Sequence, residues 1–248
     1  MNNDKKLNWV QVVKDSYNKI AREFSFSRHY VWADTQVFLD YIKNGDKVLD
    51  LGCGNGRLVD MLLSKEIEYF GVDQSEELIK NARKNYSELQ FDVMEATKLD
   101  YKDEEFDAIF SVSVLNHIPP VKHKDFFNEV FRVLKPGGYF MMANWNMWSD
   151  DNPKGLSKFQ KKMSEMNDED FQDKYGIKKN EVGPKDVLTV WGEEYLVLYY
   201  YAFEKEELEK LGVDAGFEVV KSYYSKKDLE SVKEKGNNVV SVFVKSHV

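Results

Sequence analysis

A glycine-rich turn after an apolar segment carries the first side chains of this sequence that could do chemistry. Residues 48–57 read VLDLGCGNGR, which places Gly52, Gly54 and Gly56 in the turn and Asp50 just before it. Glycine allows a sharp turn and a close approach to a ligand, where a Cβ would clash. The third glycine comes one residue earlier than in the dinucleotide fingerprint, and an acid here would repel a pyrophosphate. Asp50 instead suits a ligand that carries positive charge.

A second acid, Asp73, ends the next apolar segment, which reads YFGVD over residues 69–73. Ser75 then begins a predicted helix as its N-cap, because Leu78 and the apolar residues after it follow helical spacing. A carboxylate at a strand end can accept two hydrogen bonds from a ribose diol. Alone, Asp73 would be taken as an exposed acid, but after the glycine turn we expect it, with Gln74, to bind a cofactor.

These motifs resemble those of the class I S-adenosylmethionine (SAM) methyltransferases. The pattern D-x-G-x-G-x-G is similar to their first motif, and the resemblance extends over residues 46–145. It implies that Glu95 and Ala96, in the stretch FDVMEAT, lie against the adenine ring, although Asp is more usual than Glu there. It also implies that Asn116 and His117 follow the fourth strand and face the methyl group. A helix that stops at Pro-Gly-Gly over residues 136–138 precedes the fifth strand.

The fold class follows from alternating strands and helices between residues 47 and 143, which predict a parallel sheet with right-handed crossovers. Two helices, over 9–22 and 34–43, should precede the first strand. A helix over 203–215 and strands over 217–223 and 239–244 should end the fold. We therefore predict an α/β, doubly wound, Rossmann-like sheet of seven strands with the last strand antiparallel, as the resemblance implies.

One domain should contain four segments. Residues 1–45 form an N-terminal helical cover, and residues 46–145 form the SAM-binding core. Residues 146–198 do not fit the alternation, so we interpret them as an insertion that covers the substrate. Residues 199–248 supply the C-terminal helix and strands.

Composition limits the partners. The 248 residues carry a net charge of −8 and 42% hydrophobic residues, with no apolar run of membrane-spanning length. The single cysteine, Cys53, fits a reducing cytoplasm, and we expect neither a membrane nor a metal as partner.

Nucleic-acid binding usually needs a basic surplus, which this chain lacks overall. Lys154, Lys158 and two further lysines at 161 and 162 could form a local patch, but acids follow them closely, so a solvated helix face is the preferred interpretation.

A narrower resemblance appears at both ends of the chain. Residues 17–32 are similar to the N-terminal signature of the methyltransferases that complete carboxymethyl groups on tRNA wobble uridines, and so are residues 186–191 and 199–203. Three departures stand out: Leu198 replaces the arginine of that family, Tyr201 replaces a histidine, and Ala33 replaces a proline. The family commonly works with a small activating subunit, so the resemblance implies such a partner.

The acceptor decides what catalysis requires, because SAM is already an activated methyl donor. An alcohol or phenol needs a base, for which His117 is the candidate. A carboxylate needs only cations and hydrogen-bond donors, and Arg28 could supply the cation. We expect six residues to converge over the methyl group, as catalytic groups or as substrate contacts: Arg28, Trp32, His117, Trp145, Trp191 and Tyr199.

Three functions compete. The first is methylation of the carboxylate on a modified tRNA uridine, and the second is methylation of an O or N atom of a small molecule. Acidic charge and the missing arginine favour the second, whereas the similar segments favour the first. The third is a catalytically silent binding subunit, which has no physical need for the intact Asp50, Asp73 and glycine turn.

Overall fold

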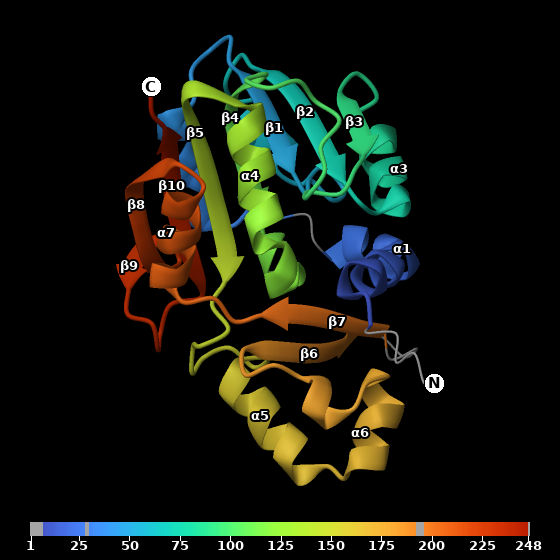
Figure 1. Ribbon diagram of the computed structural model, residues 1–248. Helices are drawn as coiled ribbons and strands as arrows, with labels where there is room; N and C mark the ends of the chain where they lie inside the picture. The colour runs from blue at the N-terminus through green and yellow to red at the C-terminus, as the bar shows by residue number, and fades with distance from the viewer. Residues whose placement is uncertain (1–6, 28–29, 192–195, 248) are drawn as a thin grey trace.

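The computed structural model describes residues 7–27, 30–191 and 196–247. Its main element is a sheet in the order β3-β2-β1-β4-β5-β10-β8-β9 (Figure 1). The strands are β1 (Lys47–Leu51), β2 (Glu68–Asp73), β3 (Gln90–Val93), β4 (Phe106–Val112), β5 (Leu134–Trp145), β8 (Phe217–Lys226), β9 (Leu229–Ser231) and β10 (Asn238–Lys245). Strands β1 to β5 are parallel, and β10 runs antiparallel between β5 and β8. The predicted seven-stranded core with an antiparallel last strand is confirmed, and β9 adds a three-residue edge.

Helices cover both faces of this sheet. Helices α4 (His123–Val133) and α7 (Lys205–Asp214) pack on one face, and α2 (Val59–Leu62) and α3 (Glu76–Asn85) pack on the other. Helix α3 begins as predicted, because the Ser75 hydroxyl accepts a hydrogen bond from the Leu78 amide at 3.2 Å. The apolar side chains of Leu78, Ile79 and Ala82 are buried, so helical spacing located the packed face.

The two N-terminal helices differ from the prediction. Helix α1 runs over Trp9–Ser27, five residues beyond the predicted end. The second is not an α-helix but the 3-10 helix η1 (Ala33–Tyr41), which begins where the Thr35 amide bonds the Trp32 carbonyl three residues back. Buried Asp34 fastens η1 to the far strands, since it accepts hydrogen bonds from Ser225, Asp228 and Asn238. These contacts join residues that are far apart in the sequence, so local sequence patterns could not predict them.

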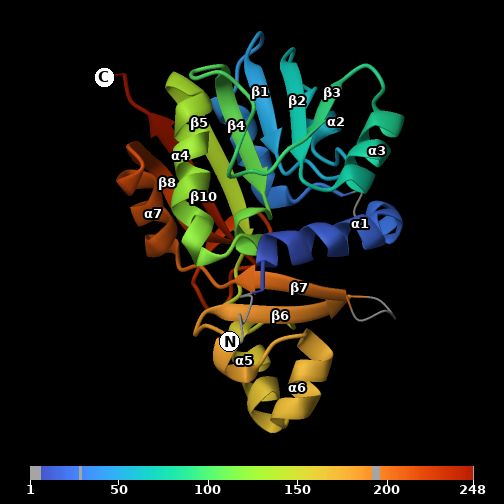
Figure 2. The same ribbon diagram turned by 45° about the vertical axis from the view of Figure 1, so that its right-hand side comes forward.

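The insertion after β5 forms a layer of its own. It contains α5 (Leu156–Glu165), α6 (Asp168–Tyr175), the 3-10 turn η4 (Lys179–Glu181) and an antiparallel hairpin of β6 (Asp186–Trp191) and β7 (Leu196–Tyr201). We call β6 and β7 the inserted hairpin. The insertion and α1 together form a separate apolar cluster. Strand β7 continues to Tyr201, three residues past the predicted end of the insertion at residue 198. Both ribbon views place α1 between the hairpin and the ends of the parallel strands (Figures 1 and 2).

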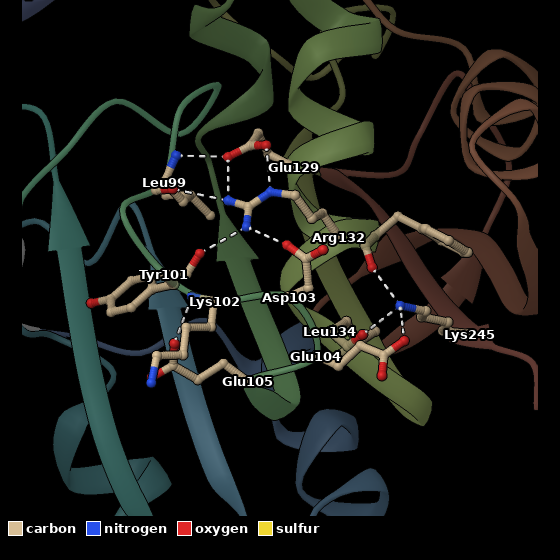
Figure 3. A network of polar contacts seen from close by, with 11 residues as sticks. Leu99, Tyr101, Lys102, Asp103, Glu104, Glu105, Glu129, Arg132, Leu134 and Lys245 are labelled. Atoms are coloured by element: carbon tan, nitrogen blue, oxygen red, sulfur yellow. Dashed lines mark hydrogen bonds and ion pairs between the residues drawn. The ribbon is translucent and has the colours of Figure 1, made fainter.

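A polar network around Arg132, at the end of α4, lies at the opposite end of the parallel strands (Figure 3). Its guanidinium donates to Glu129, Asp103 and the carbonyls of Leu99 and Tyr101. Nearby, Lys245 of β10 donates to the carbonyls of Phe131 and Leu134. The network ties the loop before β4 to α4, and it lies at the start of strands whose other ends form the site. No helix in the described ranges is long and apolar enough to cross a membrane.

Candidate functional site

A cavity of about 320 Å³ lies at the carboxyl ends of the parallel strands, under α1 and the inserted hairpin. Its volume is at the lower end of the range for small-ligand sites, roughly 300–1,000 Å³. One half, which we call the cofactor half, is formed by the ends of β1, β2 and β3 and includes Gly52, Gly54, Asp73, Gln74, Met94, Glu95, Ala96 and Thr97. The other, the acceptor half, includes Tyr17, Trp32, His117, Trp145, Met147, Asn152, Lys154, Trp191 and Tyr200.

The glycine turn forms the floor of the cofactor half. A side chain would meet different neighbours at each of its three glycines. Gly52 has φ +80°, and a Cβ there would lie 2.1 Å from Cγ2 of Val114. Gly54 also has positive φ, but its nearest neighbour would be Phe24 at 3.7 Å. Gly56 does not line the cavity, and a Cβ there would meet the Tyr86 ring at 3.1 Å. A side chain at position 52 would therefore distort the loop, whereas a Cβ at position 54 would make only an ordinary contact.

Asp73 joins the turn to the second strand. Its Oδ2 accepts from the Gly54 amide at 3.0 Å, and its Oδ1 accepts from the Ser75 amide at 2.8 Å. Burial raises the pKa of this carboxyl, and the backbone amides partly oppose the rise. Each carboxylate oxygen has a second lone pair, so Asp73 can still accept the two hydrogen bonds of a ribose diol.

Asp50, like Gly56 and unlike the other predicted cofactor residues, does not line the cavity. Its side chain is buried behind the turn rather than lining the cavity, and the Tyr69 hydroxyl donates to its Oδ2 at 3.0 Å. Burial raises the pKa of Asp50 to about 7, against the opposing effects of Tyr69 and the nearby Arg57. A cationic ligand in the cavity would favour the ionised form, so any contribution from Asp50 is an electrostatic one.

His117 lies in the 3-10 turn η2 (Leu115–His117) and connects three elements. Its Nδ1 is 2.8 Å from the Tyr199 carbonyl in β7, and its Nε2 is 3.0 Å from the Tyr17 hydroxyl in α1. A carbonyl can only accept, so Nδ1 carries the proton and Nε2 accepts from Tyr17. Burial lowers the pKa of His117 to about 4, and nearby Lys154 contributes in the same direction. His117 is neutral at pH 7 and its second nitrogen is occupied.

The structure brings together most, but not all, of the predicted acceptor residues. Trp32, His117, Trp145 and Trp191 line the cavity. Asn116 lies behind its wall, where its amide bonds the carbonyls of Trp145 and Tyr201. Tyr199 is also behind the wall and donates its hydroxyl proton to Asp186. The prediction for Arg28 lies outside the described residues.

Several cavity residues were missed by sequence reasoning, among them Tyr17, Arg57, Lys154 and Tyr200. Tyr17 opens the N-terminal segment singled out in the sequence, so its position there was an available signal. Arg57 closes the glycine turn, and its guanidinium lies 5.1 Å from the Trp32 ring centroid. The sequence favoured a solvated helix face for Lys154, but this residue lies in the loop before α5 and lines the cavity.

Comparisons with known proteins agree with this geometry. A family model described as a methyltransferase domain matches residues 42–228. The chain belongs to the SAM-dependent methyltransferase family. A SAM-dependent methyltransferase from Methanosarcina mazei has the same fold, with a TM-score of 0.67, 23% identity and coverage of 86% of this chain and 98% of the other. A similar chain occurs in the complex between the Haloferax volcanii Trm112 methyltransferase activator and a putative methyltransferase. Its TM-score is 0.65 and its identity 21%, and the match covers 95% of this chain and 98% of the other.

A relative with a named substrate matches part of this methyltransferase. The tRNA (carboxymethyluridine(34)-5-O)-methyltransferase of Arabidopsis thaliana is 34% identical over 136 residues, which are 54% of this chain and 33% of the relative. The chain thus spans about a third of the length of that relative.

The cofactor half fits SAM, which the family implies. Asp73 offers acceptors for the ribose, and Leu78, Met94 and Ala96 offer apolar surface for the adenine. Gly54 lines the cavity and donates its amide hydrogen to Asp73. The cofactor half therefore combines hydrogen-bond acceptors with apolar surface, as SAM requires.

Proposed function

We propose that this methyltransferase transfers a methyl group from SAM to the carboxylate of a carboxymethyl-modified wobble uridine in tRNA. The observation that carries the proposal is the composition of the acceptor half. It combines aromatic side chains with the cation of Lys154 and a neutral imidazole, and none of the described residues that line it is an acid. Such a site favours a planar acceptor with negative charge.

The described residues of this half include no effective base, which supports the same conclusion. SAM supplies a methyl group on a sulfonium, which needs only a nucleophile in line with the bond that breaks. A base works best when its pKa is near the working pH, whereas the pKa of His117 is about 4. Its Nε2 is also bonded to Tyr17. His117 therefore holds Tyr17 in place, and the acceptor should arrive ionised, as a carboxylate does at pH 7.

Similarity to known proteins supports the tRNA acceptor and a partner. The Arabidopsis relative is named for carboxymethyluridine, and the Haloferax structure pairs a similar fold with the Trm112 activator. We propose that this chain also works with a small activating subunit. The single, buried cysteine, Cys53, fits a reducing compartment, and we propose the cytoplasm.

Analysis of tRNA nucleosides by mass spectrometry tests the substrate. The protein, with SAM and with or without a Trm112-type subunit, is incubated with tRNA that contains 5-carboxymethyluridine. We expect the carboxymethyl nucleoside to disappear and its methyl ester to appear in equal amount. The Asp73→Ala variant serves as the inactive control. If the nucleoside persists in the presence of both SAM and the subunit, the tRNA proposal is wrong.

The dependence of the rate on pH should be nearly flat. At saturating SAM, we expect kcat to change less than about two-fold between about pH 5.5 and 8.5, because no proton leaves a carboxylate acceptor. The lowered pKa of His117 keeps its imidazole neutral across this window. Burial raises the pKa of Asp50 to about 7, but bound SAM is cationic and favours its ionised form. A histidine base with an ordinary pKa would instead lose about ten-fold in rate by pH 5.5. A rise with a midpoint between pH 6 and 7 that disappears in His117→Gln would contradict the prediction.

The alternative is methylation of a small molecule at O or N. The net charge of −8 favours it, since tRNA binding gains from a basic surface. Leu198 in place of the family arginine favours it too. Methyl transfer to a small aromatic acid, with no transfer to tRNA, would support this second function.

A further inference from the structure

The loop between β5 and α5, residues 146–155, is fastened by buried amides. The side chain of Asn146 donates to the carbonyls of Lys233 and Gly236, and the side chain of Asn152 donates to the Asn146 carbonyl. Asn152 also accepts from the Lys154 amide at 2.9 Å. Both asparagines are buried. The backbone that carries Lys154 is therefore held in place before any acceptor binds, which reduces the entropy cost of binding.

Lys154 directs its charge toward the acceptor half. It lines the cavity, its Nζ lies 5.4 Å from the centroid of the Trp191 ring, and its charge lowers the pKa of His117. Lysine and tryptophan attract each other in this arrangement, which restricts the flexible side chain. The ammonium thus lies beside the ring wall where a planar acceptor would stack.

Among the described residues, neither position 198 nor Arg57 supplies a cation at this point, and Arg28, the cation that the sequence suggested, lies outside them. Leu198, which stands in place of the family arginine, is buried in the apolar cluster of the insertion. Arg57 lies over Trp32, and one of its nitrogens is 3.5 Å from the Val112 carbonyl, beside Asp50. The charge of Arg57 therefore lies beside Trp32 and Asp50, whereas that of Lys154 lies beside Trp191 and His117.

We propose that Lys154 binds the carboxylate of the methyl acceptor and turns one carboxylate oxygen toward the methyl group. This inference rests on the proposed carboxylate acceptor and extends it by naming the residue that recognises the reacting group. An ammonium of this kind would compensate for the arginine that Leu198 replaces.

The same ion pair would make the protein bind the substrate more tightly than the product. A lone pair on the carboxylate oxygen forms the new bond to the methyl carbon, while the bond from that carbon to sulfur breaks and its electrons stay on sulfur. The anionic carboxylate and the cationic sulfonium become a neutral ester and a neutral thioether, with no proton transferred. Lys154 would lose its anionic partner in the reaction, so the ester should bind more weakly than the acid.

Two RNAs and three variants test the inference. The probes are an anticodon stem-loop with 5-carboxymethyluridine at the wobble position and the same stem-loop with its methyl ester. Equilibrium binding of each is measured with S-adenosylhomocysteine present, and KM and kcat are measured with SAM, adding the activating subunit where activity requires it. The variants are Lys154→Gln, Lys154→Arg and the matched control Lys161→Gln, which removes an exposed lysine of α5 that lies outside the cavity.

We expect Lys154→Gln to weaken binding of the acid and to raise its KM by about 10- to 100-fold, as for loss of a hydrogen bond between charged groups. Its affinity for the ester and for S-adenosylhomocysteine should stay within about two-fold of the unmodified protein. Lys154→Arg should restore most of the preference for acid over ester, and Lys161→Gln should retain it. Unchanged preference in Lys154→Gln, or an equal loss in Lys161→Gln, would overturn the inference while leaving the proposed function intact. If the unmodified protein neither methylates the acid nor binds it more tightly than the ester, the proposed function fails and the inference with it.

Discussion

Replacing Gly52 with alanine should weaken SAM binding by about 100-fold or more. The new Cβ would lie 2.1 Å from Cγ2 of Val114, at a residue whose φ is +80°. The contact strains the original turn by about 1–3 kcal/mol, and the left-handed backbone adds about 1–2 kcal/mol for a residue with a side chain. The free protein would relax this strain by moving the turn, and SAM binding would have to restore it. Either the turn or Val114 must move, and both line the cavity. Isothermal titration calorimetry with SAM measures the loss.

Gly45→Ala is the matched control for this change. Gly45 has φ +89°, but a Cβ there would meet nothing within 4 Å, and the residue is outside the cavity. We expect a similar backbone cost in thermal stability and no change in SAM affinity. Equal SAM affinity in Gly52→Ala and Gly45→Ala would show that the turn does not bind the cofactor.

Replacing Asp73 with alanine should reduce SAM affinity by roughly 100- to 10,000-fold. Two hydrogen bonds to the ribose diol would be lost, each worth about 1.5–3 kcal/mol because the acceptor is charged. The change also removes the partners of the Gly54 and Ser75 amides. The turn that receives the methionine part is thereby loosened as well.

Asp100→Ala provides the comparison for Asp73→Ala. Asp100 is an exposed acid in the next loop and does not line the cavity. Calorimetry should therefore give the unmodified affinity for this variant, which excludes a general effect of removing negative charge. A folded Asp73→Ala protein that binds SAM as tightly as Asp100→Ala does would disprove the assignment of the ribose site.

The sequence predicted the parts of this molecule that local spacing determines. Apolar segments, the glycine turn and the Ser75 cap identified β1, β2 and α3, and these elements position the cofactor half. The 3-10 form of η1 was missed, because the contacts of Asp34 with β8 and β10 connect residues almost 200 positions apart.

The acceptor half was harder to predict for the same reason. Its residues come from α1, η2, the loop after β5 and the inserted hairpin, so only tertiary packing decides which side chains face inward. Tyr199 and Tyr200 are neighbours on one strand, and they point to opposite faces. The preferred tyrosine, Tyr199, bonds Asp186, while Tyr200 lines the cavity. A shift of one residue in a strand is enough to exchange such roles.

Helix α1 contacts both halves of the cavity, which has a consequence for the order of events. At the middle of α1, Asn18 accepts from the Ser75 hydroxyl beside the cofactor half, and the adjacent Tyr17 bonds His117 in the acceptor half. The Ser16 hydroxyl also donates to the Val197 carbonyl in β7 at 2.8 Å. A ligand that steadies α1 in one half lowers the cost of ordering it for the other, and this linkage is reciprocal. Donor and acceptor should therefore bind with positive cooperativity, and each should slow the departure of the other.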